Sequence, residues 1–386
     1  MLELLFLLLP IAAAYGWYMG RRSMRVNQQR SQQNLSRNYV EGLNFLLSDQ
    51  PDKAVDRFIE LLQVDSDTFD THLSLGNLFR KRGEVDRSIR LHQNLIARPY
   101  LEPEQKDLAM MELAKDFLAA GLYDRAEEIL LQLVKEPDHS QESEQLLLSI
   151  YQANREWWKA IRLVKKFRRA DRQSMMPQVA HFYCQLAEQE ADPQQQRKLW
   201  FKALKVDSGC GRANIALFRQ SLDQGEDSEG MAAVERLVKH SPEWLCETLP
   251  DALIPFERQQ RLEQYEQLLE QVMNRLPATS AVLALAELVV QKQGREAAQQ
   301  LILSQLKRHP TLRGFHRLMG LHTDALGAEP ARDSLMLLSD LVEKQIRLRP
   351  KYRCLQCGFP GHSLHWQCPS CKSWGQIQRI RGLDGE

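Results

Sequence analysis

Residues Leu73–His92 read LSLGNLFRKRGEVDRSIRLH. Within this stretch Gly76 and Phe79 have helical spacing, and Ser88 and His92 have helical spacing after a break at a short polar turn. A small residue beside a bulky one, twice in succession, is what two closely packed antiparallel helices need at their crossing. The same four positions hold small and bulky residues 34 residues earlier, at Gly42, Phe45, Ala54 and Phe58.

The pattern continues along the chain as a repeat. A shift of 38 residues from the quoted stretch, and then of 34, reaches Ala114, Phe117, Ala126 and Leu130, followed by Leu148, Tyr151, Ala160 and Val164. A later copy consists of Ala286, Val289, Ala298 and Ile302, and Pro310 closes it. A period of 34 residues with two helices is the tetratricopeptide pattern. We predict about nine helical hairpins over residues 36–350, in an all-α superhelix with a concave protein-binding surface. Generic helical hairpins in place of the weaker copies, and an unrelated helical bundle, are the alternatives.

Composition agrees with a helical chain of more than one domain. The chain has 386 residues, of which 43% are hydrophobic and 26% are charged. Its 51 basic and 50 acidic residues leave a net charge of +1. Because a nucleic-acid footprint needs a basic excess, this balance argues against nucleic acid as the main partner.

The N-terminus reads MLELLFLLLPIAAAYGWYMGRR, in which Glu3 is the one charged residue before Arg21. About 20 apolar residues span a bilayer core, and aromatic rings favour its interface. A cleaved signal peptide would carry basic residues before the apolar run, and a buried core helix would be less apolar on all sides. We therefore predict a transmembrane anchor at residues 1–20 and a basic juxtamembrane linker at 21–35. The arginines after the anchor place the bulk of the chain on the cytoplasmic side of the membrane.

Four of the seven cysteines lie near the C-terminus, in CLQCGFPGHSLHWQCPSC. Two C-x-x-C pairs, Cys354 with Cys357 and Cys368 with Cys371, indicate one tetrahedral metal ion, iron or zinc, in a domain at residues 351–386. With all four positions filled by sulfur, the site is predicted to be structural rather than catalytic. Two disulfides, a thioredoxin-type redox centre and ligation by His362 or His365 are the alternatives.

Other residues of this small domain have predicted supporting roles. Gly358 allows a left-handed turn after the first pair, and Pro369 stiffens the second. Phe359, Trp366 and Trp374 are expected to cover a module too small to have its own core. We also expect the domain to dock on the repeat array and to fix its last turns.

Within the array the sequence singles out a few further side chains. Asn77, Arg80 and Lys81 would lie on an inner helix and bind a partner's backbone or carboxylate, although a solvated polar face has the same composition. Trp157 and Trp158 are interpreted as packing between hairpins rather than as a binding platform. Cys184, Cys210 and Cys246 have no partner at metal spacing, so we expect buried small hydrophobes at these positions.

The anchor, the array and the terminal CLQCG and CPSC motifs together resemble the lipopolysaccharide assembly protein B family of Gram-negative bacteria, which has a rubredoxin-like C-terminal module. The resemblance covers the whole chain and implies metal ligation by Cys354, Cys357, Cys368 and Cys371. It also implies an inner-membrane adaptor that works with the membrane protease FtsH to promote degradation of the deacetylase LpxC. Other lipopolysaccharide assembly proteins are further implied partners, and homodimer formation is compatible with the array.

Two other functions compete with the adaptor. A rubredoxin-like iron site transfers electrons, and a tethered repeat array serves as a general co-chaperone for peptide tails. An enzyme is disfavoured, because the sequence contains no H-E-x-x-H, G-x-S-x-G, phosphate-loop or dinucleotide-binding motif.

Overall fold

The computed structural model describes residue 19 and residues 69–99, 101–323 and 330–385. Three predicted segments therefore lie outside the described residues: the basic linker, the first repeat at Gly42 and, except for Met19, the membrane anchor. In the part of the chain that is described, no helix is both long and apolar enough to cross a membrane.

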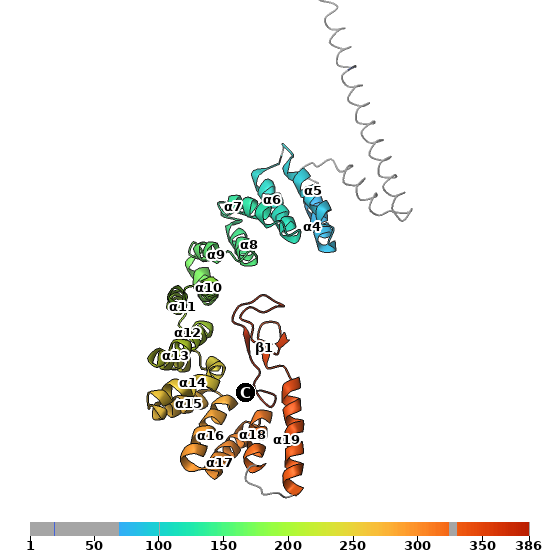
Figure 1. Cartoon of the computed structure of the whole chain (residues 1–386). Helices are drawn as coiled ribbons and strands as arrows, with labels where there is room; N and C mark the ends of the chain where they lie inside the picture. Colours follow the sequence, from blue (N-terminus) through green and yellow to red (C-terminus); the bar gives the residue numbers. More distant parts are fainter. Residues whose placement is uncertain (1–18, 20–68, 100, 324–329, 386) are drawn as a thin grey trace, which may run out of the picture. The chain divides into compact units, whose positions relative to one another are not determined.

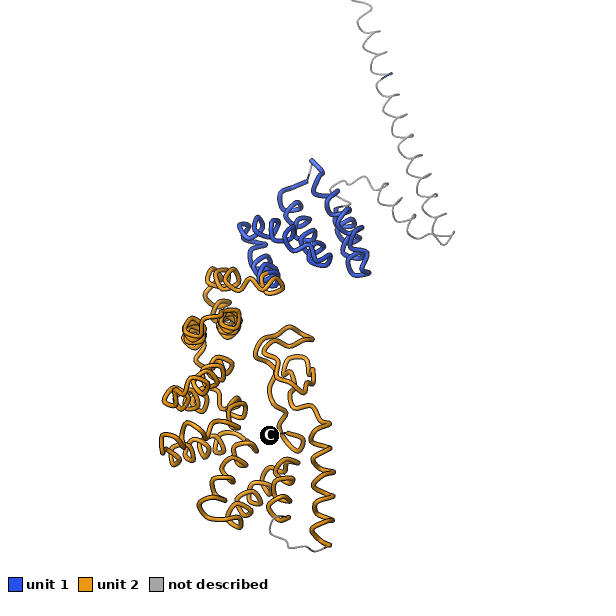
Figure 2. The backbone as a smooth tube through the Cα atoms, in the orientation of Figure 1, with its two compact units in different colours: residues 1–150 blue, residues 151–386 orange. Residues whose placement is uncertain are grey.

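The chain divides into two compact units, residues 1–150 and 151–386 (Figure 2). The described helices that begin in the first unit are α4 (Phe69–Arg82), α5 (Val85–Ile96), α6 (Pro103–Ala119), α7 (Tyr123–Leu133) and α8 (Ser140–Ala153). The helices of the second unit are α9 (Trp157–Val164), α10 (Arg169–Gln189), α11 (Pro193–Val206), α12 (Gly211–Gln224), α13 (Asp227–His240), the 3₁₀ helix η2 (Pro242–Glu247), α14 (Leu249–Arg258), α15 (Leu262–Arg275), α16 (Thr279–Gln293), α17 (Arg295–Arg308), α18 (Leu312–Thr323) and α19 (Pro330–Leu348). Consecutive helices pack in pairs, most extensively α4 on α5, α6 on α7, α10 on α11, α12 on α13 and α16 on α17. This is the predicted tetratricopeptide-like architecture.

Small residues lie where the paired helices cross. Ala114, Ala126, Ala160 and Ala298 are fully buried, as their place in the repeat requires. At Gly76 a Cβ atom would stand 2.3 Å from Nε2 of His92, so only glycine lets α5 approach α4 this closely. The crossings predicted from the repeat are thus confirmed at these residues.

Most turns inside the hairpins contain one residue with positive φ, namely Gly83, Gly121, Arg155, Gly225, Gln260 or Gly294. The turn between α10 and α11 is an exception, with Glu190 at φ −83° and Asp192 at φ −80°. In five of the turns with positive φ the following residue donates its N–H to a carbonyl five residues earlier, in the pairs Glu84 to Phe79, Leu122 to Phe117, Glu156 to Tyr151, Glu226 to Ser221 and Arg261 to Phe256. These turns continue the period of the repeat through the region between Cys184 and Pro277, where the sequence pattern is weak.

A small three-stranded sheet follows the last helix. Strand β1 (Tyr352–Cys354) lies between β2 (Pro360–Gly361) and β3 (Ile377–Arg379), and both neighbours are antiparallel to it. Tyr352 pairs with Gly361 on one side and with Arg379 on the other. Within the second unit this ribbon lies alongside α10 to α14 (Figure 1).

Candidate metal centre

Two similar loops carry the four cysteines. In the first, the N–H of Gly358 donates to the carbonyl of Cys354 at 2.9 Å, and in the second the N–H of Lys372 donates to the carbonyl of Cys368 at 3.0 Å. The residue after each pair has positive φ, 79° at Gly358 and 60° at Lys372. The prediction for Gly358 is confirmed, whereas the corresponding position of the second loop is held by a lysine that the sequence did not single out.

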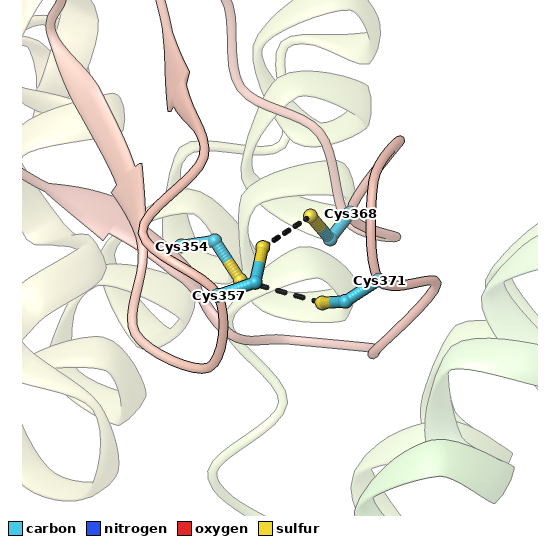
Figure 3. Close-up of side chains that lie close together, drawn as sticks. All are labelled: Cys354, Cys357, Cys368 and Cys371. Atoms are coloured by element: carbon cyan, nitrogen blue, oxygen red, sulfur yellow. Dashed lines mark hydrogen bonds between the residues drawn. The ribbon is translucent and has the colours of Figure 1, made fainter.

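The four sulfurs converge on one point (Figure 3). The Sγ atoms of Cys354 and Cys371 are 3.7 Å apart, those of Cys357 and Cys368 are 3.6 Å apart, and all four lie within 4.8 Å of one another. A tetrahedron of sulfurs about 2.3 Å from a metal has edges of about 3.8 Å. The arrangement therefore fits one metal ion, and it is the one such group of His, Cys, Asp or Glu side chains found among the described residues.

The environment of the thiols differs from one sulfur to the next. A hydrogen bond with the Ser373 side chain, 2.9 Å away, lowers the pKa of the Cys371 thiol to about 6. Burial raises the pKa of Cys368 to about 11. Cys354, Cys357, Cys368 and Cys371 would hold the metal ion, and its positive charge would stabilise their thiolates, including that of Cys368, which burial disfavours.

His362 and His365 do not belong to this group. Both side chains are exposed, and Nε2 of His365 is 3.1 Å from the hydroxyl of Ser363. The alternative of histidine ligation therefore receives no support from the structure. Two of the four ligands, Cys357 and Cys371, are exposed, while Cys354 and Cys368 are buried in the small core of the ribbon.

Aromatic rings join one end of the ribbon to the array. Trp374 stacks on His181 of α10 at 5.5 Å and meets Trp157 and Phe182 edge-on, each at 5.9 Å. Its indole N–H donates to Oε1 of Gln152 at 2.9 Å. The ring centroids of Trp366 and Trp244, the latter on η2, are 4.8 Å apart. These contacts bury one face of the ribbon against helices that precede it by more than a hundred residues.

A carboxylate joins the other end. Oε1 of Glu247, at the end of η2, accepts a hydrogen bond from the hydroxyl of Tyr352 at 2.9 Å and one from Nε of Arg379 at 2.8 Å. Arg379 also lies over the ring of Tyr352. The two donors come from adjacent strands, so a single acidic side chain of the array fixes the sheet of the ribbon.

Comparison with known proteins now identifies the family. The family model described as "Rubredoxin metal binding domain" matches residues 352–379. The chain is 44% identical over 388 residues to lipopolysaccharide assembly protein B of Escherichia coli (strain K12), with 100% of both chains covered. The chain belongs to the lipopolysaccharide assembly protein B family. The relative of that name in Haemophilus influenzae is 39% identical over 391 residues, with 98% of each chain covered.

A solved structure is also similar to this member of the family. A tetratricopeptide repeat protein from Parabacteroides merdae matches 71% of this chain and 99% of its own, at 12% identity and a TM-score of 0.32. A TM-score this low carries no further argument about the repeat architecture, which is described above from the structure itself.

The docking predicted for the ribbon is confirmed, but its main place on the array is different. The contacts concentrate on α9, α10 and η2, in the middle of the chain. Near the last hairpin the tail contributes one backbone hydrogen bond, from the N–H of Leu312 to the carbonyl of Leu383 at 2.9 Å.

The positions of Trp366 and Trp374 also differ from expectation. They face the array, and the core of the ribbon consists of Tyr352, Cys354, Cys368 and Ile377 with Phe359 and Leu364 packed against it.

Sequence reasoning missed the partners of the ribbon on the array. His181, Gln152 and Glu247 have no spacing that connects them to the cysteines. The one available signal was aromatic content, because two tryptophans in a module of this size exceed what its own core can bury. Sequence reasoning also missed the role of Gly375. Because a Cβ there would lie 2.9 Å from Nε2 of His181, glycine lets the ribbon approach α10 closely.

The residues predicted to bind a partner lie near the end of α4. Arg80 is half-buried and donates to Oδ1 of Asn77, to Oε2 of Glu112 and to Oδ1 of Asp116. Lys81 is exposed. Arg80 and Asn77 are thus engaged within the first unit, and binding of a partner by these three residues stays a prediction.

The remaining cysteines and the tryptophan pair are divided between interior and surface. Cys184 and Cys210 are buried with their sulfurs 3.9 Å apart, whereas Cys246 is only half-buried, so the expectation was wrong for Cys246. Trp157 packs as predicted, between α9, α10 and the ribbon. Trp158 is 48% exposed and meets Tyr183 edge-on.

Proposed function

We propose that this protein is a non-enzymatic adaptor of lipopolysaccharide synthesis, anchored in the inner membrane by residues 1–20. It holds the LpxC deacetylase on its repeat array and presents it to the FtsH protease, which shortens the lifetime of LpxC. It also gathers other lipopolysaccharide assembly proteins at the membrane. A tether of this kind raises the local concentration of two partners without any chemical step of its own.

The observation that supports this proposal is the attachment of the metal ribbon to the array at two separate points. Trp374 lies in an aromatic pocket at one end, and Glu247 joins two strands at the other. A module attached in this way braces the helices it touches and leaves the remaining surface of the array for partners. Membership of the lipopolysaccharide assembly protein B family supports lipopolysaccharide assembly as the process in which such a scaffold acts.

The bound metal ion would be held by Cys354, Cys357, Cys368 and Cys371. Its contribution is to fold the ribbon, because a site closed by four sulfurs leaves no position for a substrate. The chain's own residues then keep the folded ribbon on the array: Glu247 orients the sheet, and His181 supports the ring of Trp374.

The test is the half-life of LpxC in cells with and without this protein. We expect depletion to lengthen the half-life several-fold, and the effect to require both residues 1–20 and active FtsH. An unchanged half-life would remove the adaptor role.

A matched pair of variants connects the function to the geometry. Glu247→Ala removes the acceptor shared by Tyr352 and Arg379 and should lengthen the half-life of LpxC. Glu243→Ala changes the same 3₁₀ helix one turn earlier and should not. If both variants degrade LpxC normally, docking of the ribbon is not needed for the adaptor role.

Electron transfer is the second candidate, and the exposure of Cys357 and Cys371 favours it. Exposed sulfur ligands provide a route for electrons to reach a metal ion. This function requires bound iron that is reduced and reoxidised reversibly. A purified protein that contains zinc and shows no reversible reduction excludes it.

A further inference from the structure

A concentrated basic surface lies on α9, on the loop that follows it and on α11. Residues 155–172 contain eight lysines and arginines against two acidic residues, and residues 193–206 contain four against none. The whole chain has a net charge of only +1, so the excess here is local. Nothing in the metal centre or in the docking of the ribbon uses it.

Most of these cations have no acidic partner. Among the described residues, ion pairs engage Lys159 with Glu156, and Arg197 with Glu226 and Glu229. No ion pair in the described part of the chain involves the exposed residues Arg162, Lys165, Lys166, Arg168, Arg169, Lys198, Lys202 or Lys205. A solvated helix normally intersperses both signs, which α11 does not.

One exposed aromatic ring joins the two segments, and a second lies on α11. Trp158 of α9 is 48% exposed, and Nζ of Lys202 of α11 lies 5.9 Å from its ring centroid. Phe201 is 40% exposed, with the guanidinium groups of Arg197 and Arg236 each 5.9 Å from its ring. We name this surface the basic–aromatic face; it comprises Trp158, Arg162, Lys165, Lys166, Lys198, Phe201, Lys202 and Lys205.

The composition of the face selects one kind of partner. Protein interfaces are depleted in lysine at their centres, which disfavours a folded protein. Nucleic-acid stacking needs an open aromatic face, whereas here cations lie over the rings of Trp158 and Phe201. Lysines with amphipathic aromatic rings suit the headgroup layer of an anionic membrane, where charge is attracted and rings enter the interface.

We propose that the basic–aromatic face binds the anionic lipid headgroups of a membrane surface. It provides a peripheral contact for the second unit, distinct from any segment that spans the bilayer. The face acts through charge and two rings, so it holds the array close to the bilayer without inserting a helix. The contact goes beyond the adaptor function and does not depend on it.

The experiment uses the full chain in lipid nanodiscs of two compositions, phosphatidylcholine alone or an equal mixture with phosphatidylglycerol. The rate of lysine acetylation is measured by mass spectrometry. In the anionic discs we expect labelling of Lys198, Lys202 and Lys205 to slow by about 5-fold or more. Half-molar NaCl should restore the rate, because salt screens exposed charges. Lys344 on α19 is the reference and should label equally in both discs.

Charge-reversal variants sharpen the test. In the triple variant Lys198→Glu, Lys202→Glu, Lys205→Glu, the protection of Lys165 and Lys166 should fall to the level seen in phosphatidylcholine. A control with the same change of net charge, Lys106→Glu, Lys307→Glu, Arg308→Glu, should keep that protection. All six positions are exposed, so both proteins should fold.

Three results would overturn the proposal. Equal labelling in the two kinds of disc would show that headgroup charge is irrelevant. Loss of protection in the control variant would assign the effect to total charge rather than to this face. Stronger protection by a single-stranded oligonucleotide than by anionic discs would make the face a nucleic-acid site. Incorporation into the discs tests residues 1–20 separately, so failure of the anchor is distinguishable from failure of the face.

Discussion

Buried charges join helices α4 to α6 of the first unit, whereas aromatic rings and one carboxylate join the ribbon to α9, α10 and η2 of the second. In the first unit Asp116 is fully buried and accepts from Nη1 of Arg80 at 2.7 Å, and its other oxygen is 2.5 Å from Nδ1 of His92. Burial alone would raise the pKa of Glu112 beside it, but hydrogen bonds from Lys115 and Arg80 outweigh burial and hold that pKa below its usual value.

The two kinds of contact respond differently when one member is lost. A buried charge network is stable only while every member is paired, so losing one member is costly. An aromatic interface depends on area and shape, and it can release a module without leaving buried charges behind. The second kind therefore lets the ribbon leave the array while the helices stay paired.

Loss of the metal should have the largest effect, and it should be confined to the ribbon. Structural metal sites contribute an apparent free energy of about 10–16 kcal/mol to folding. We expect Cys368→Ser, or removal of the ion by a chelator, to unfold residues 351–386 and to make Arg353 and Lys372 sensitive to trypsin, while the helices stay folded. Limited proteolysis with metal analysis is the measurement. Cys246→Ser is the control, and a metal-free ribbon that resists trypsin would contradict the structural role.

Removal of Asp116 should be the next most damaging change. Asp116→Ala removes the fully buried acceptor that joins Arg80 to His92, at a cost of about 3–5 kcal/mol. Glu142→Ala removes an exposed partner of Lys115 and should cost less than about 1 kcal/mol. Amide hydrogen exchange of α5 and α6 measures both. Equal losses in the two variants would show that the network is not what holds the first unit together.

Acid should weaken the second unit through His181. Burial, with help from Arg212, lowers the pKa of His181 to about 3, so the folded protein keeps the imidazole neutral. The unfolded imidazole binds a proton below about pH 6.5, so stability falls as pH falls, by about 1.4 kcal/mol for each unit. At pH 5 the loss should reach about 2 kcal/mol.

His181→Phe is the control for that acid effect. It keeps a ring against Trp374 and removes the titrating group, so urea unfolding of the second unit between pH 5 and 7 should lose this part of its pH dependence. Metal content must be measured on the same samples, because thiolates also bind protons. An identical pH dependence in the two proteins would exclude His181 as the cause.

The smallest effect should come from the two loops that hold the cysteines. Lys372→Gly relieves a left-handed backbone at a non-glycine residue and should stabilise the ribbon by about 0.5–1 kcal/mol. Gly358→Ala is the converse, since its Cβ would meet open space and the cost of about 1 kcal/mol is conformational. The denaturant midpoint of metal release measures both. Shifts of the same sign would show that the loops are not equivalent.

The sequence alone determined the helical repeat and the metal ligands. Both depend on local spacing: small and bulky residues recur at helical intervals, and two cysteines three residues apart point into one turn. Such patterns can be recognised without the fold, because the interacting groups are close along the chain. Ala114 and Ala126 show it for the repeat, and Cys354 with Cys357 shows it for the metal.

The weak repeats show the limit of that reasoning. In one of them Gln260 adopts the left-handed conformation that glycine has in other turns, as Arg155 does in a clear repeat, so the backbone repeats where the residue type does not. Likewise His92 occupies a position that the pattern assigned to packing, and the structure shows it paired with Asp116.

The positions of the two tryptophans of the ribbon follow from tertiary contacts alone. Trp374 and its acceptor Gln152 are 222 residues apart, and Glu247 is more than a hundred residues from both of its donors. No periodicity links groups so distant, because their meeting depends on how many hairpins stack and through what angle each one turns. Such long-range contacts depend on the positions of many stacked hairpins, and those positions are known only once the whole array is folded.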